Sequence, residues 1–182
     1  MKRIIVSAIA VVLIAMSFAS CYDPLSATNQ KSTNASDATT SGESEKAKAK
    51  KVKAEDYEKT FEGLYDYMKD SGFITVDENK SNVVKMNVKL IGAEKGYKYT
   101  MGNIRIELYA FNLKGENKTR DKILDSVKKD GTYTIYSQVI PAYLTDDGKF
   151  MMIYANPDVR EGDTTSDAYL NMQKAVKAFK KF

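Results

Sequence analysis

Histidine and tryptophan are absent from this sequence, and a single cysteine, Cys21, occurs among its 182 residues. These absences exclude a disulfide scaffold, a zinc site with Cys and His ligands, and catalysis by a Ser-His or Cys-His pair. They also exclude a pH switch based on histidine. The sequence contains neither GxxxxGK(S/T) nor GxGxxG, so the two common phosphate-binding loops are missing.

An excess of one charge is also missing from most of the chain. The whole sequence has 28 basic and 24 acidic residues, a net charge of +4. Residues 54–182 contain 20 of each, so the excess lies in the N-terminal third. Because nucleic-acid binding requires a concentrated positive surface, we expect no nucleic-acid partner.

Metal and catalytic motifs are incomplete. Asp77, Asn79 and Ser81 have the alternate spacing of a calcium loop. However, Asn82 stands where that loop needs glycine and Val88 where it needs glutamate, which excludes an EF-hand. The acidic segment 156–163 is interpreted as a solvated connection that leads into a helix. No feature selects a pair of catalytic carboxylates, so we expect no enzyme activity, no metal and no cofactor.

The longest apolar run lies at the N-terminus. Lys2 and Arg3 precede residues 4–18, which are apolar except for Ser7 and Ser17. This run is shorter than the ~20 residues that a transmembrane helix needs. A positive start followed by an apolar run of this length is typical of a signal peptide. The run ends in Phe18-Ala19-Ser20-Cys21.

This ending resembles the lipobox of bacterial lipoproteins, in which a cysteine follows the cleavage site. The resemblance covers Met1 to Cys21 and implies a signal peptide over residues 1–20, with a diacylglyceryl thioether on Cys21. Phe18 departs from the usual aliphatic residue. The resemblance implies a lipid-anchored protein of the cell membrane whose domain lies on the extracytoplasmic side. An ordinary secretory signal with an incidental cysteine is the alternative.

Residues 21–53 are interpreted as a flexible, lipid-anchored stalk. They are rich in Ser, Thr, Asn, Ala and Asp, and large apolar residues are rare after Leu25. Such a segment buries too little surface to offset the entropy of ordering. The lysines between 46 and 53 fit a solvated tether, or contact with anionic headgroups or wall polymers. Residues 54–182 are then a single α+β domain.

Hydrophobic periodicity predicts three helices and four strands in this domain. The helices are expected over 54–69, 119–129 and 166–181. The strands are expected over 84–90, 97–112 with a bulge at Gly102-Asn103, 132–143 and 149–155. The last strand lacks alternation, so both of its faces should be covered.

The resulting fold class is α+β, a four-stranded, mostly antiparallel sheet with helices on one face, in the order αββ-αββ-α. Similar helix ends at Lys69-Asp70-Ser71-Gly72 and Lys129-Asp130-Gly131 leave an internal duplication open.

Tyrosine is the remaining unusual feature, with 12 copies. If no helix covers the outer face of the sheet, aromatic and polar side chains mix there in a pattern that suits recognition. The candidate binding face consists of Arg105, Glu107, Tyr109, Phe111, Tyr136 and Gln138. Ordinary cross-strand pairing, or a second core under the helix at 166–181, are the alternatives.

These observations predict an envelope protein, attached to the membrane through lipid on Cys21, whose domain binds a protein or wall polymer without catalysis. A solute-binding accessory lipoprotein of a transporter is the alternative, and an envelope hydrolase is a third.

Overall fold

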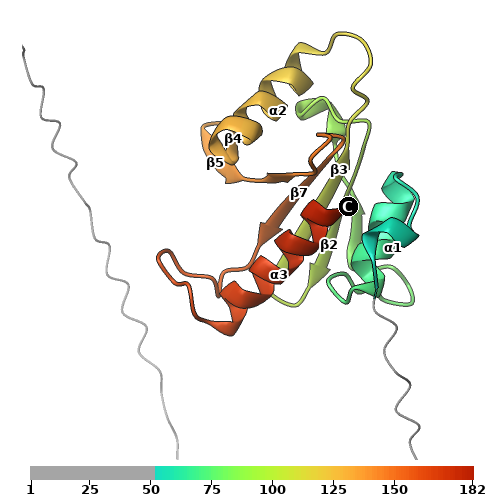
Figure 1. The fold of residues 1–182 in the computed structure, drawn as a ribbon. Coiled ribbons are helices and arrows are strands. Elements are labelled where there is room, and N and C mark those ends of the chain that lie inside the picture. The colour runs from blue at the N-terminus through green and yellow to red at the C-terminus, as the bar shows by residue number, and fades with distance from the viewer. Residues whose placement is uncertain (1–51) are drawn as a thin grey trace, which may run out of the picture. The chain divides into compact units, whose positions relative to one another are not determined.

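The computed structural model describes residues 52–182 (Figure 1). The predicted signal peptide, Cys21 and nearly all of the predicted stalk lie outside these residues. The helices are α1 (Phe61–Asp70), α2 (Lys118–Asp130) and α3 (Asp167–Lys181), with 3-10 turns η1 (Ala54–Asp56) and η2 (Val88–Leu90). The strands are β1 (Val83–Lys85), β2 (Lys95–Met101), β3 (Ile104–Ala110), β4 (Thr132–Ile135), β5 (Gln138–Pro141), β6 (Tyr143–Leu144) and β7 (Phe150–Ala155).

The predicted α+β class and the antiparallel pairing are confirmed, but the main sheet has five strands and not four. Its order is β1-β2-β3-β7-β6, and every neighbouring pair is antiparallel. A second sheet consists of β4 and β5 alone. A hairpin turn at Thr145-Asp146-Asp147-Gly148, between the predicted strands 132–143 and 149–155, joins β6 to β7.

The single strand predicted over 97–112 is in fact a hairpin of β2 and β3. Met101 pairs with Ile104, which leaves Gly102-Asn103 as a two-residue turn, and Gly102 has a φ of 58°. Glycine adopts this left-handed conformation without steric cost, which favours a tight turn over a bulge. The change of hydrophobic parity at this point therefore marks a reversal of the chain.

The strand predicted over 84–90 is also wrong beyond its first residues. β1 ends at Lys85, and η2 follows as one turn of 3-10 helix. The side chain of Asn87 accepts a hydrogen bond from the Lys89 N–H at 3.3 Å, which caps that turn. Local capping of this kind competes with strand pairing. Val84 and Leu90, at the two ends of the predicted strand, are 46% and 45% exposed.

The strand predicted over 132–143 is divided into β4, β5 and β6. Ile135 pairs with Gln138, so Tyr136-Ser137 forms a two-residue turn between β4 and β5. Pro141 has no N–H to donate, and the chain leaves the small sheet there before β6 joins the large one. The αββ units therefore have no structural counterpart, because α1 and α2 are followed by different arrangements of strands.

The helix boundaries follow from side-chain caps. α1 begins at Phe61 and not at residue 54, because the Thr60 hydroxyl accepts a hydrogen bond from the Gly63 N–H at 3.1 Å. The side chain of Asn117 caps α2, and Gly131 ends this helix in the left-handed conformation. The prediction for α3 is confirmed to within one residue, with Ser166 as its cap.

The prediction that the helices lie on one face of the sheet is wrong. α1 and α3 cover one face, whereas α2 and the β4–β5 hairpin cover the other (Figure 1). Each face has its own core. The first core contains Leu64, Met68, Ile106, Leu108, Met152 and Phe179, among others. The second contains Tyr109, Phe111, Ile123, Val127, Tyr133, Met151 and Ile153, among others. β7 supplies both cores, as its lack of alternation predicts.

Candidate functional site

Half of the predicted binding face lies inside the second core. Tyr109 and Phe111 are 4% and 5% exposed, so the expectation of an open aromatic face is wrong for both. The Tyr109 ring lies across Gly96, where an added Cβ would come within 2.6 Å of the ring. A second core on this face is one of the predicted alternatives, but with the C-terminal helix over it. The covering elements are α2 and the β4–β5 hairpin, because the apolar stripe of α2 needs a surface to bury.

Glu107 is the polar centre of this buried face. Its carboxylate accepts a hydrogen bond from the Tyr109 hydroxyl at 2.6 Å and lies 3.3 Å from Nε of Arg105. Burial, and next the hydrogen bond to Glu107, raise the pKa of Tyr109. Burial, and then the charge of Glu107, raise the pKa of Tyr133 to about 12. Glu107 is 7% exposed, so this carboxylate is placed to hold the fold together and not to meet a substrate.

The other predicted residues are accessible, but they do not form one surface. The Arg105 side chain is 50% exposed at the margin of the second core. Tyr136 and Gln138 lie at the tip of the β4–β5 hairpin. The structure therefore divides the six predicted residues between a buried cluster, a margin and a hairpin tip.

The hairpin tip is the clearest exposed apolar feature among the described residues. Tyr136 is 80% exposed and Val139 is 66% exposed. Thr134 pairs with Val139, so these two side chains share the outward face of the hairpin, opposite the buried Tyr133. We call Thr134, Tyr136, Gln138 and Val139 the hairpin surface. Sequence reasoning missed Val139 because it read the segment as one continuous strand.

The backbone at this tip is strained. Tyr136 and Ser137 have φ values of 47° and 65°, the left-handed pair of a type I′ turn. Asn-Gly is the usual sequence there, and a bulky residue with positive φ is a real outlier. Residues 132–141 contain no Gly, Asn or Asp, the residues typical of such a turn. The sequence therefore does not predict a turn here.

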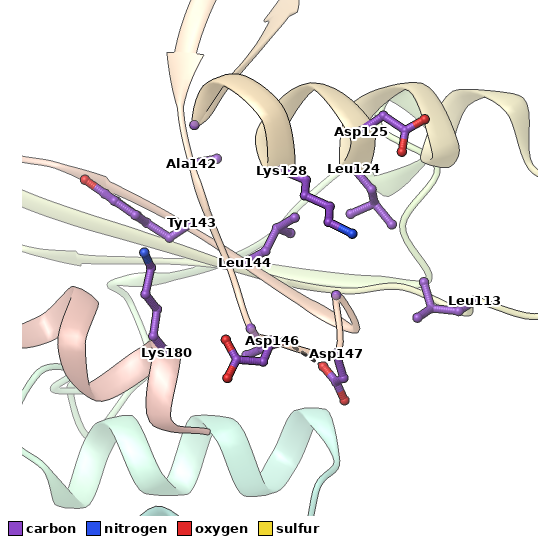
Figure 2. A pocket seen from close by; sticks show the side chains of 13 residues that line it. Leu113, Leu124, Asp125, Lys128, Ala142, Tyr143, Leu144, Asp146, Asp147 and Lys180 are labelled. Atoms are coloured by element: carbon purple, nitrogen blue, oxygen red, sulfur yellow. Dashed lines mark hydrogen bonds between the residues drawn. The ribbon is translucent and has the colours of Figure 1, made fainter.

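A hollow of about 590 Å³ lies between α2, β6 and the turn before β7 (Figure 2). Leu124 and Leu144 give it an apolar floor, and Lys128, Asp146 and Lys180 stand around it (Figure 2). Its charged side chains come from three separate elements and carry both signs. They do not converge on one point in the way that a preorganised ligand site requires.

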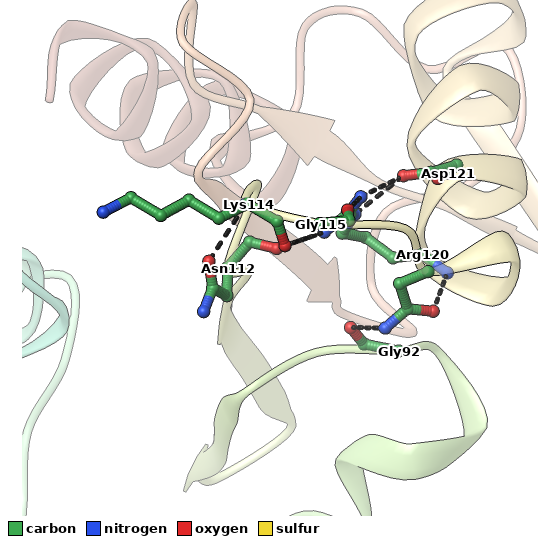
Figure 3. Close-up of polar contacts among 7 residues, drawn as sticks. Gly92, Asn112, Lys114, Gly115, Arg120 and Asp121 are labelled. Atoms are coloured by element: carbon green, nitrogen blue, oxygen red, sulfur yellow. Dashed lines mark hydrogen bonds and ion pairs between the residues drawn. The ribbon is translucent and has the colours of Figure 1, made fainter.

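Arg120 holds the loop between β3 and α2 and forms no part of a ligand site. Its guanidinium donates to the backbone carbonyls of Asn112 and Gly115, and its Nε donates to Asp121 (Figure 3). Asn117 caps α2 and donates to the carbonyl of Gly92, which joins this loop to the one before β2. These donors and acceptors are used within the fold.

Residues 52–182 contain neither a metal-binding cluster nor a membrane-spanning helix. Within that range, no three Asp, Glu, Cys or His side chains are grouped so that they could bind a metal ion. None of the helices in the described part of the chain has the length and apolarity needed to cross a membrane. The chain matches no protein-family model, no curated protein and no solved structure.

Proposed function

We propose that this chain is a lipid-anchored, extracytoplasmic envelope protein whose α+β domain binds a partner protein through the hairpin surface. One observation carries the binding role. A tyrosine occupies a left-handed turn position that disfavours it, and its side chain is 80% exposed. Strain of this kind collects at functional sites, where a side chain is kept for a purpose other than folding.

The chemistry of the tip favours a protein over a wall polymer. Tyr136 and Val139 project from a narrow two-stranded hairpin, so the surface presents two exposed apolar side chains. A protein can offer a concave pocket for an aromatic anchor, and tyrosine is enriched among the residues that dominate binding energy. The proposal includes no catalytic step.

Replacement of Tyr136 with asparagine is expected to separate binding from folding. Asparagine tolerates the left-handed conformation, so the variant should be as stable as the parent or more stable by up to about 1 kcal/mol. Binding should fall sharply, because the anchor is removed. A photocrosslinking residue in place of Gln138 would report contact with a partner in intact cells, and thermal unfolding would report stability.

Ser137→Gly is the matched control for this test. It relieves the second strained position of the same turn and leaves the Tyr136 side chain in place. We expect the crosslinked product to form with this variant and to disappear with Tyr136→Asn. The same product at the same yield in both variants would remove the hairpin surface from the proposal.

The anchoring part of the proposal rests on the lipobox resemblance and has a separate test. Replacement of Cys21 with alanine removes the sulfur that would form the thioether. We expect labelling with a radioactive fatty acid to be lost and the protein to leave the detergent phase in a phase partition. Ser26→Thr, which lies outside the lipobox and keeps Cys21, serves as the control. Continued labelling of Cys21→Ala would refute the lipid attachment.

A further inference from the structure

The outer edge of the main sheet is open over part of β7. β3 pairs with all six residues of β7, but β6 pairs only with Met151 and Met152. On the β6 side, Ile153–Ala155 has no strand partner among residues 52–182. Continuing the register of Tyr143 with Met152 would place Pro141 opposite Tyr154. Pro141 pairs instead with Thr132 in the small sheet, and it has no N–H to donate.

The backbone of Tyr154 points toward this open edge. The Phe150 carbonyl accepts a hydrogen bond from the Thr145 N–H at 3.1 Å, which places the backbone groups of Phe150 on the β6 side. Because these groups alternate along an antiparallel strand, those of Met152 and Tyr154 point to the same side. The edge ends after Ala155, where the Asn156 carbonyl accepts from the Val159 N–H and the chain turns away.

A groove of about 650 Å³ runs along the same edge. Its lining is mainly apolar and comes from the β2–β3 turn, β3, β5, β6, β7, the following loop and α3. The residues that concern the edge are Arg105, Pro141, Tyr143, Tyr154, Ala155 and Met172. An unpaired edge beside pockets for alternate side chains is the arrangement by which proteins bind an extended peptide as an added strand.

Arg105 supplies the charge of the groove. It pairs with Ala155 from β3, on the side of β7 away from the open edge, and its side chain lines the same groove. Its Nε contacts Glu107 at 3.3 Å, whereas no residue between 52 and 182 accepts a hydrogen bond from its two terminal nitrogens. A half-exposed guanidinium with free donors is complementary to a carboxylate, which it can bind with two parallel hydrogen bonds.

We propose that the open edge of β7 binds an extended peptide segment of a partner protein, with apolar side chains in the groove and an acidic side chain at Arg105. The peptide adds a short sixth strand to the main sheet beside Tyr154. This site shares no residue with the hairpin surface, so each can fail without the other.

The test uses the full chain and a synthetic hexapeptide of alternating valine and threonine with one glutamate at an end. Chemical shifts of the backbone amides are followed by NMR as peptide is added. We expect saturable shifts at Ile153–Ala155 and at Arg105. The same peptide with alternate amides N-methylated cannot donate to a strand edge, and it should bind at least tenfold more weakly.

Two substitutions, one in the protein and one in the peptide, test the ion pair between Arg105 and the glutamate of the peptide. Arg105→Gln should weaken binding about tenfold, and a peptide with lysine in place of glutamate should lose binding to the same degree. Lys177→Gln, an exposed position on α3, should leave the affinity unchanged. Equal affinity for the N-methylated and the parent peptide would overturn the proposal, as would an absence of shifts. Shifts that depend on protein concentration alone would identify a second copy of the chain as the occupant, and would also overturn it.

Discussion

Above about pH 10, the domain is expected to unfold in one steep transition. Four tyrosines with less than a tenth of their surface exposed carry this prediction, namely Tyr67, Tyr99, Tyr109 and Tyr133. At each of them burial is the first cause of a raised pKa, and at Tyr133 the pKa rises to about 12. The folded protein therefore keeps protons that the unfolded chain releases.

The direction of the effect follows from this difference in bound protons. Below about pH 10 both states hold the four protons, and the full stability is present. Above it the unfolded chain ionises first, so each tyrosine lowers the free energy of unfolding by about 1.4 kcal/mol per pH unit until its folded pKa is reached. Tyr99, Tyr109 and Tyr133, whose pKa values rise most, together remove about 4 kcal/mol per unit, which is a large part of the stability of a typical domain.

Circular dichroism and tyrosinate absorbance, recorded on one pH titration, would check this prediction. Loss of secondary structure should coincide with the ionisation of several tyrosines. Tyr133→Phe is the matched variant, because burial and the charge of Glu107, and no hydrogen bond, raise the pKa of Tyr133. It should shift the transition to higher pH and reduce its steepness by roughly a third. Gradual ionisation of all tyrosines in a domain that stays folded would contradict the argument.

Replacement of Arg120 with alanine is expected to cost about 3 kcal/mol of stability. The Arg120 side chain is 6% exposed, and it satisfies backbone carbonyls of the loop that leads into α2. Removal of the guanidinium leaves those carbonyls without a donor and leaves a gap under the loop. Arg120→Lys should rescue only part of the loss, because an ammonium group cannot span the same acceptors as a planar fork.

Urea unfolding would measure this loss as a shift of the midpoint at constant slope. The control is Arg160→Ala, at an exposed arginine in the loop before α3, which should change stability by less than about 0.5 kcal/mol. Equal losses in the two variants would mean that the loop network around Arg120 adds nothing beyond a surface charge.

The sequence predicts best those elements that are specified locally. The apolar stripe of α3 and the cap at Ser166 are close together in the chain, and so are the residues of the turn at 145–148. β7 is similar, since an apolar run without alternation already indicates that both faces are buried. In each case the pattern and the structure involve the same few neighbouring residues.

The errors arise where distant segments decide the outcome. Tyr109 and Phe111 alternate with a buried set and could equally face water or a second layer. Their burial depends on α2 and on the β4–β5 hairpin, and the sequence carries no signal for where these pack. The division of residues 132–144 into three strands depends on Pro141 and on a turn without a turn-forming residue. The hairpin surface and the open edge of β7 are both products of that division.

The way in which the two cores share strands has a consequence for how the chain reaches its fold. β1, β2 and β3 are joined by short connections, whereas β3 and β7 are separated by residues 111–149. Met151, Met152 and Ile153 are needed on opposite faces, so neither core is complete until β7 has met β3. Closing that long loop costs conformational entropy, and this cost precedes the stabilising contacts between β7 and β3. Pairing of β7 with β3 is therefore the step expected to limit the folding rate, and both cores are expected to form together after it.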